Sequence, residues 1–156
     1  MSRRRRAEKR GLVADPKYNS ELVARFVNCI MRRGKKTTAE RIVYRALDQI
    51  KTTSSEDPLE VLTRAVDNAK PRVEVRSRRV GGSTYQVPVE VNRNRQLALA
   101  MRWLTQFSGA RKGVAMEKAL AAELLDAFKN QGNAIRKRDD VHKMAQANKA
   151  FAHYAW

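Results

Sequence analysis

The sequence has few of the side chains on which catalytic and metal-binding sites usually depend. Its 156 residues include one cysteine, Cys29, and two histidines, His142 and His153. One cysteine cannot form an internal disulfide, and together with two histidines it cannot build a Cys/His zinc cluster. The sequence therefore predicts a protein without a metal or other cofactor, in a reducing, intracellular compartment.

Long apolar runs are also missing from the chain. No stretch approaches the roughly 18 apolar residues of a membrane span, and the N-terminal sequence Met-Ser-Arg-Arg-Arg-Arg lacks the apolar segment of a signal peptide. We therefore expect a protein that has no membrane partner and is not secreted.

Acidic residues are scarce relative to basic ones. The chain has 33 lysines and arginines against 16 aspartates and glutamates, which gives a formal net charge of +17. Self-repulsion at this charge opposes a compact state, so a polyanionic partner is expected, and nucleic acid is the leading class. The hydrophobic content of 42% is sufficient for one buried core.

The positive charge is concentrated in two parts of the chain. Residues 1–36 carry a net charge of +9 and residues 70–113 carry +8, whereas residues 37–69 carry −2 and residues 114–156 carry +2. On a protein whose whole surface is evenly basic, the positive charge would not be concentrated in two stretches of the sequence. The pattern indicates a nearly neutral scaffold with two basic working surfaces.

Most apolar residues recur at helical spacing, which predicts six helices. We expect Asn19 or Ser20 to cap the first helix, and Thr37 with Glu40 to form a capping box at the start of the second. Pro71 should stop the third helix. The apolar stripes of the six helices lie at 22–31, 39–50, 59–69, 97–107, 115–128 and 135–145.

Between the third and fourth helices the apolar period changes from 3.6 to 2. Valines alternate with polar residues on both sides of Gly81-Gly82, which suits a tight hairpin turn. Because Pro88 cannot donate to a ladder and no third strand is near, the ribbon should have free edges and project from the helices.

The predicted fold class is therefore mainly α. It consists of a six-helix, bundle-like domain over residues 16–156 with one protruding two-stranded β-hairpin at about 72–91. A basic arm over residues 1–15, with almost no apolar content before Leu12, should be disordered until it meets a partner.

Basic side chains in three segments form one candidate nucleic-acid footprint. Guanidinium groups grip phosphate oxygens bidentately, and a two-stranded ribbon is narrow enough to enter or straddle a groove. The alternatives are a solubilising or targeting tail for the arm and an ordinary charged outer face for the hairpin. The candidates are Arg3, Arg4, Arg5, Arg6, Lys9 and Arg10 in the arm, Arg72, Arg76, Arg78 and Arg79 on the hairpin, and Arg93, Arg95, Arg102, Arg111 and Lys112 in and after the fourth helix.

Two aromatic residues are candidates for stacking on bases. Trp103 is expected beside the basic face of the fourth helix rather than in its apolar stripe, where it could stack on a nucleotide or merely cover the helix edge. Tyr85 is a weaker candidate, because a tyrosine among valines is more often packed.

Enzymatic alternatives find little support in the sequence. The stretch Gly34-Lys35-Lys36-Thr37 lacks the glycine that a phosphate-binding loop needs five residues earlier, where Cys29 stands. Asp139 and Asp140 are neighbours on a helix and point apart, so they do not form a catalytic pair of carboxylates. No histidine lies near Cys29 in sequence to activate its thiol as a nucleophile. We expect no catalysis and no small-molecule substrate.

Several segments together resemble a known family. The pattern Ser20-x-Leu22-x-x-x-Phe26-Val27, followed after six residues by Gly34-Lys35-Lys36, resembles the signature of the ribosomal protein S-seven family of the small subunit. The segment from Lys70 to Val91 is similar to that family's hairpin nearly letter for letter, and the resemblance extends over essentially the whole chain.

The resemblance implies a bacterial-type ribosomal protein that binds the 3′ major domain of small-subunit ribosomal RNA and nucleates assembly of the head. It also implies a hairpin near the exit-site transfer RNA at the intersubunit face, and a C-terminal helix near the platform and the messenger exit path. Neighbouring head and platform proteins would be its other partners. The location would be a cytoplasmic ribosome or an organellar one.

Carried over by position, the resemblance also implies roles for individual residues. The arm, the loop lysines Lys35 and Lys36, and the basic candidates named above, together with Trp103, would face ribosomal RNA. A second set would lie near transfer RNA or a platform protein: Gly81, Gly82, Arg136, Lys137, Arg138 and Lys143.

Two rival functions remain open from the residues alone. An architectural DNA-binding protein could use the ribbon in a groove, but such ribbons usually carry an apolar wedge at the tip, and Gly81-Gly82-Ser83 offers none. An RNA-processing enzyme would need a metal or acid/base cluster, for which the sequence holds no candidate.

Overall fold

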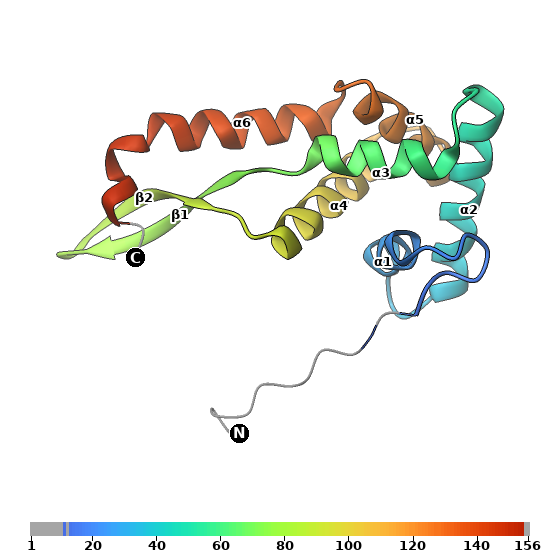
Figure 1. Ribbon diagram of the computed structural model, residues 1–156, viewed down its shortest axis with the longest axis horizontal. Coiled ribbons are helices and arrows are strands. Elements are labelled where there is room, and N and C mark those ends of the chain that lie inside the picture. Colours follow the sequence, from blue (N-terminus) through green and yellow to red (C-terminus); the bar gives the residue numbers. More distant parts are fainter. Residues whose placement is uncertain (1–10, 12, 155–156) are drawn as a thin grey trace.

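The computed structural model describes residue 11 and residues 13–154 of the chain, and this part is mostly helical (Figure 1). The predicted mainly α fold with one hairpin is confirmed, and a short 3₁₀ helix that was not predicted follows the last α-helix. In order, the elements are α1 (Glu21–Ile30), α2 (Lys36–Thr53), α3 (Pro58–Ala69), β1 (Val73–Val80), β2 (Ser83–Glu90), α4 (Arg93–Ala110), α5 (Met116–Phe128), α6 (Asn133–Ala147) and η1 (Lys149–Tyr154).

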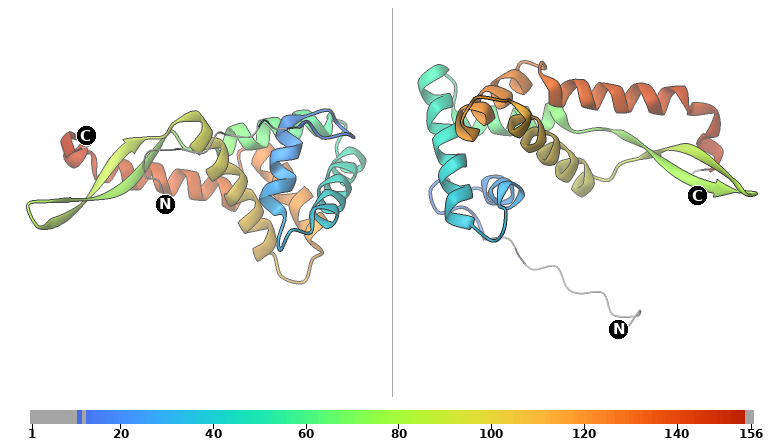
Figure 2. Two further views of the ribbon diagram at one scale, coloured as in Figure 1. Left: turned by 90° about the horizontal axis from the view of Figure 1, so that it is seen from below. Right: turned by 180° about the vertical axis from the view of Figure 1, so that it is seen from behind.

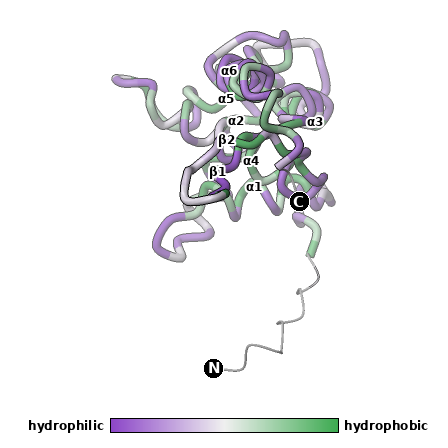
Figure 3. The backbone as a smooth tube through the Cα atoms, turned by 90° about the vertical axis from the view of Figure 1, so that its left-hand side faces the viewer, coloured by the Kyte–Doolittle hydropathy of each residue, from purple (hydrophilic) through white to green (hydrophobic). Residues whose placement is uncertain are grey.

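Helices α1 to α5 form a helical body around one hydrophobic core. The apolar stripe of each helix turns inward, and Phe26, Leu47, Leu62, Leu104 and Leu120 are completely buried there. Figure 3 shows hydrophilic positions along the outer loops of this body and hydrophobic positions toward its middle. Burial of this stripe is the main favourable term that holds the helices together.

Helix α4 occupies a more central place than its apolar pattern predicts. It contacts α1, α3, α5 and α6, so it is covered on more than one side. Trp103 is consequently a core residue with only 7% of its surface exposed. The prediction that Trp103 lies beside the basic face was wrong, because the buried sector of α4 is wider than the stripe from Leu97 to Phe107.

The starts of two helices differ from what the sequence suggests. Helix α2 begins at Lys36 with Lys35 in the N-cap position, and no side chain caps it. The predicted capping box of Thr37 and Glu40 is therefore absent, because Thr37 already lies inside the first turn. Helix α4 has a side-chain cap that was not predicted, in which the Asn92 side chain accepts a hydrogen bond from the Arg95 backbone at 3.0 Å.

The hairpin is a long antiparallel ribbon with a two-residue turn. Arg76 pairs with Val87 and Val80 with Ser83 across the strands. Gly81 and Gly82 join them with φ values of 57° and 90°. Both values lie in the left-handed region that side chains disfavour, so glycine suits both positions. The ribbon extends well beyond the helical body (Figures 1 and 2).

The prediction of free edges is confirmed, because the sheet has only the strands β1 and β2 within the described residues, but the ribbon is also supported by the C-terminal part of the chain. Helix α6 runs beside it and η1 folds back onto it (Figure 2). The Tyr85 ring lies 5.3 Å from the rings of both Phe151 and Tyr154. Tyr85 is therefore a packing residue of this ribbon and not an open stacking platform.

At the base of the ribbon, His142 on α6 joins the helix to the strand that follows α3. The backbone N–H of Arg72 donates to His142 Nε2 at 3.0 Å. Burial, together with the nearby charges of Arg138 and Arg72, lowers the pKa of His142 despite the opposing influence of Asp139. The imidazole is therefore held neutral, as its role of acceptor requires.

None of the helices within the described ranges, residue 11 and residues 13–154, combines the length and apolar character that crossing a membrane requires.

Candidate nucleic-acid interface

The loop between α1 and α2 is a compact basic turn. Arg33 and Gly34 both have positive φ, 53° and 73°. Backbone hydrogen bonds from Lys35 to Arg32 (3.1 Å) and from Lys36 to Gly34 (2.9 Å) close the turn. The four basic side chains of this loop, which we call the α1–α2 basic loop, are Arg32, Arg33, Lys35 and Lys36, and all are exposed.

Little of the charge of the α1–α2 basic loop is neutralised within the described part of the chain. Lys36 lies 3.8 Å from Glu40, in a pair whose lysine is 65% accessible and whose glutamate is half-buried. Such pairs are worth little in water. Arg32 and Arg33 were not among the predicted site residues, although the sequence Arg-Arg-Gly-Lys-Lys around a left-handed glycine was a readable signal.

The hairpin arginines are divided between two faces of the ribbon. Alternate residues of a strand point to opposite faces, so Arg76 and Arg78 share one face and Arg79 lies on the other. Arg76 and Arg79 are exposed, whereas Arg78, opposite Tyr85, is half-buried. The predicted hairpin cluster therefore does not form a single basic face.

An acidic residue at the base of the ribbon holds two of the predicted arginines. Glu74 is 7% exposed and accepts hydrogen bonds from Arg76 Nε at 2.6 Å and from Arg95 Nε at 2.8 Å. Burial by itself would raise the pKa of Glu74, but the hydrogen bonds from Arg95 and Arg76 outweigh it and hold the pKa below its usual value. Glu74 thus joins β1 to α4 and offsets part of the charge there.

Helix α4 presents its predicted arginines to solvent. Arg93, Arg95 and Arg102 are all exposed, and neither Arg93 nor Arg102 has an ion pair within the described residues. With Arg72 and Arg79 they form the second basic surface, which we call the hairpin–α4 surface.

Arg111 does not extend that surface, which corrects the prediction. Its guanidinium bridges Glu123 and Asp126, with Nη2 at 2.6 Å from a carboxylate oxygen of each. Glu123 is completely buried and also accepts the backbone N–H of Ala134 at 3.1 Å. Arg111 is therefore a structural bridge from α4 to α5 and α6, and the neighbouring Lys112 remains exposed.

On α6, one of the four predicted basic residues faces inward. Arg138 donates to the backbone carbonyl of Asn68 and pairs with Asp139, which ties α6 to the end of α3. Arg136, Lys137 and Lys143 are exposed. The predicted basic stretch of α6 is thus an exposed face with Arg138 as a structural tie beneath it.

The predicted contacts of the arm fall on Arg3, Arg4, Arg5, Arg6, Lys9 and Arg10, which lie outside the described residues. The last residue of the arm, Asp15, is anchored to α2. The buried carboxylate of Asp15 accepts hydrogen bonds from the backbone of Lys17 and Tyr18, each at 3.1 Å, and from the hydroxyl of Tyr44 at 2.6 Å. Burial and this bond to Asp15 raise the pKa of Tyr44, so its hydroxyl keeps its proton.

Comparison with known proteins identifies the family. A family model described as ribosomal protein S7p/S5e matches residues 2–149. The chain belongs to the ribosomal protein S7p/S5e family. This confirms the resemblance found in the sequence, and the family is structural and non-enzymatic. As a member of this family, the chain is a small-subunit ribosomal protein with a structural role in translation, and ribosomal RNA and other ribosomal proteins are its partners.

Relatives in several bacteria match the chain over its full length and theirs. Each is named small ribosomal subunit protein uS7. The chain is 58% identical to the protein of Anaeromyxobacter sp. (strain Fw109-5) over 156 residues, and 57% identical to that of Sorangium cellulosum (strain So ce56). It is 54% identical to the protein of Acidithiobacillus ferrooxidans (strain ATCC 53993 / BNL-5-31). The chain is accordingly a family member of the bacterial type.

Proposed function

We propose that this family member binds the 3′ major domain of small-subunit ribosomal RNA directly and nucleates assembly of the head of the subunit. One observation carries the proposal. Exposed cations occupy two parts of the fold, the α1–α2 basic loop and the hairpin–α4 surface, on a body with a single core, and only Lys36 and Arg95 among them have an acidic partner in the described chain. Two separated basic surfaces on one folded domain suit an RNA junction, because each can neutralise the phosphates of a different helix.

The tip of the hairpin and the exposed face of α6 would serve a second set of neighbours. Gly81 and Gly82 at the tip, with Arg136, Lys137 and Lys143 on α6, would lie close to the exit-site transfer RNA at the intersubunit face, to the messenger path or to a platform protein. Support comes from the shape of the molecule, since the ribbon and α6 extend together away from the helical body (Figure 2).

Filter binding over a range of salt concentrations tests direct binding. The full-length protein should bind a transcript of the 3′ major domain more tightly than a transcript of another ribosomal RNA domain or a DNA duplex of equal length. Equal affinity for all three at physiological salt would refute specific recognition. It would also revive the architectural DNA-binding alternative.

A charge variant tests the assignment of the hairpin–α4 surface. Arg79→Ala with Arg93→Ala removes two exposed cations and should lower affinity for the transcript about tenfold and reduce the salt slope by roughly 2 units. Lys51→Ala with Lys129→Ala removes two exposed cations elsewhere and should change neither. Equal losses in both variants would mean that the protein responds only to net charge.

A further inference from the structure

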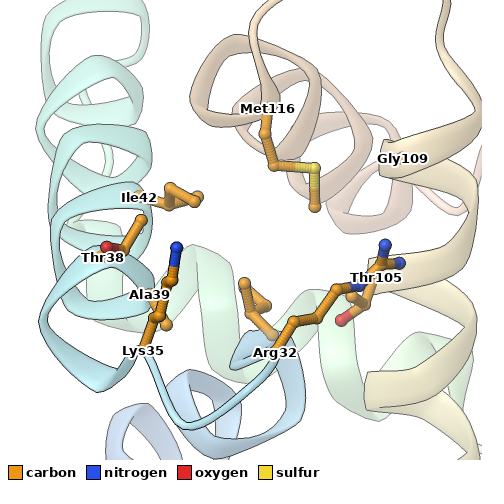
Figure 4. A pocket seen from close by; sticks show the side chains of 9 residues that line it. Arg32, Lys35, Thr38, Ala39, Ile42, Thr105, Gly109 and Met116 are labelled. Atoms are coloured by element: carbon orange, nitrogen blue, oxygen red, sulfur yellow. The ribbon is translucent and has the colours of Figure 1, made fainter.

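A cavity of about 410 Å³ opens between the α1–α2 basic loop and the facing ends of α4 and α5. This is near the lower end of the range of roughly 300–1,000 Å³ that is usual for small-molecule sites. It is large enough for one nucleoside or nucleotide and too small for a stretch of duplex. Figure 4 shows Arg32 and Lys35 reaching toward it from the loop, while Met116 points into it from the opposite side.

The lining of the cavity combines an apolar floor with a basic rim. Ile30 and Ala39 are buried in the floor, and Ile42 and Met116 complete its apolar walls. The thioether of methionine is soft and polarisable, and it makes favourable contacts with aromatic rings. A flat aromatic group is therefore a good match for the space between Met116 and the two isoleucines.

The charge of the rim favours an anion. Arg32 and Lys35 are the charged residues of the lining, and neither has an ion pair within residues 13–154. The acids nearest to the cavity in sequence are already engaged, because Glu40 faces Lys36 and Glu117 lies 3.5 Å from Arg45. The positive charge at the mouth of the cavity is thus left for a partner.

Two hydroxyl groups supply polar contacts at the walls. Thr105 Oγ1 donates to the backbone carbonyl of Met101 at 2.9 Å and lies 3.7 Å from Cys29 Sγ, so one of its two acceptor lone pairs is left for a ligand. The Thr38 hydroxyl has no hydrogen bond within the described chain. Apolar walls, a few convergent polar groups and a cationic mouth are the elements of a site for a base with its phosphate.

We propose that this cavity receives a single unstacked nucleotide of the bound RNA. The base lies against Met116 and the isoleucines, Thr38 and Thr105 meet its edge, and Arg32 and Lys35 hold the adjacent phosphates. The proposal rests on the proposed RNA-binding function and adds a specific subsite to it. Phosphate contacts alone carry no sequence information, whereas a base held in a pocket can be read.

Filling the cavity with an uncharged side chain separates this subsite from general electrostatic binding. A Cβ atom added at Gly109 meets no atom within 4 Å, so Gly109→Phe can occupy the cavity without a backbone clash. Thr38→Phe fills it from α2, at a position that is exposed in the first helical turn. A second filling variant on a different helix guards against a folding defect in either one.

Each filling variant should bind the 3′ major-domain transcript about tenfold more weakly with an unchanged salt slope, because a stacking contact is lost and no charge is removed. Arg32→Ala with Lys35→Ala should lower both the affinity and the slope, and Lys51→Ala with Lys129→Ala should lower neither. Chemical probing of the RNA should show one nucleotide that loses protection in both filling variants.

Three outcomes would overturn part or all of this picture, and they can be told apart. If the folded filling variants bind the transcript as tightly as the wild-type protein, the nucleotide subsite is refuted and the proposed function stands. The cavity would then be a candidate contact for a neighbouring protein. Failure of the wild-type protein to bind the transcript would refute the proposed function itself. In NMR titrations of the full chain, the Met116 methyl should shift with adenosine or uridine monophosphate. An equal shift with inorganic phosphate alone would show that the cavity binds anions and does not recognise a base.

Discussion

The helical body and the ribbon that extends from it are stabilised in different ways. In the body, helices α1 to α5 enclose an apolar core, and the arginines and lysines of the α1–α2 basic loop play little part in holding the fold together. In the ribbon, packing against α6 and η1 is joined by ion pairs, in which Glu74 holds Arg76 and Arg95 and so joins β1 to α4. The comparison teaches that a basic residue of the ribbon can be a structural residue as well as a contact for RNA.

The largest effect should come from Glu123, a completely buried carboxylate on which the body depends. Glu123→Gln keeps the shape of the side chain but removes the charge that faces Arg111. Because Arg111 would keep only Asp126, we expect the free energy of unfolding to fall by about 3 kcal/mol in urea denaturation. Asp126→Asn, at a more exposed carboxylate, should cost less than about 1 kcal/mol. Equal losses of unfolding free energy in the two variants would contradict the claim that the buried carboxylate stabilises the fold more than the exposed one.

The corresponding change in the ribbon is Glu74→Gln. It weakens the charge-assisted hydrogen bonds from Arg76 and Arg95, which are worth about 1.5–3 kcal/mol for a buried group. The loss should be local, with faster amide hydrogen exchange in β1 and β2 and little change in α2 or α5. Uniform acceleration over the whole chain would show that the ribbon and the body unfold as one unit.

Tyr85→Ala tests the second support of the ribbon. It removes the ring contacts with Phe151 and Tyr154, and aromatic pairs of this kind are worth about 0.5–1.5 kcal/mol beyond their buried area. Amide exchange in β2 and η1 should accelerate together. Tyr85→Phe is the matched control, because it keeps the ring and should leave exchange unchanged.

The smallest effect concerns pH at the base of the ribbon. The pKa of His142 is lower in the folded chain than its ordinary value of about 6.5, so the unfolded chain binds more protons. The contribution of its hydrogen bond with Arg72 is therefore complete above about pH 6.5 and is lost as the pH falls through the lower folded value. The protection factor of the Arg72 amide, its exchange rate corrected for the intrinsic effect of pH, should fall on acidification. In His142→Gln this pH-dependent fall should vanish.

Much of the helical body could be predicted from the sequence, because its elements depend on local patterns. The apolar stripes located all six α-helices, and Gly81-Gly82 located the turn of the hairpin. Helix η1 escaped prediction because its six residues carry no apolar stripe, and its aromatic rings have their partner in Tyr85, far away in sequence.

The candidate site was predictable in composition but not in arrangement. The sequence shows that Arg111 and Arg95 are basic, but their acidic partners Glu123 and Glu74 lie 12 and 21 residues away and meet them only in the folded chain. Trp103 was misplaced for the same reason, since its burial depends on how many helices surround α4. Contacts between residues far apart in sequence decide which basic side chains stay exposed and unpaired, and these contacts cannot be read from local patterns.

The two-residue turn at the end of the ribbon has a consequence for the kind of contact it can make. Residues 81–84 read Gly-Gly-Ser-Thr, so the tip of the ribbon carries no charge, and at the two glycines it carries no side chain either. A neighbour at this point meets peptide N–H and C=O groups and two hydroxyls at close range. Binding there depends on shape and clearance and should be indifferent to ionic strength, in contrast to the arginine-lined flanks only a few residues away.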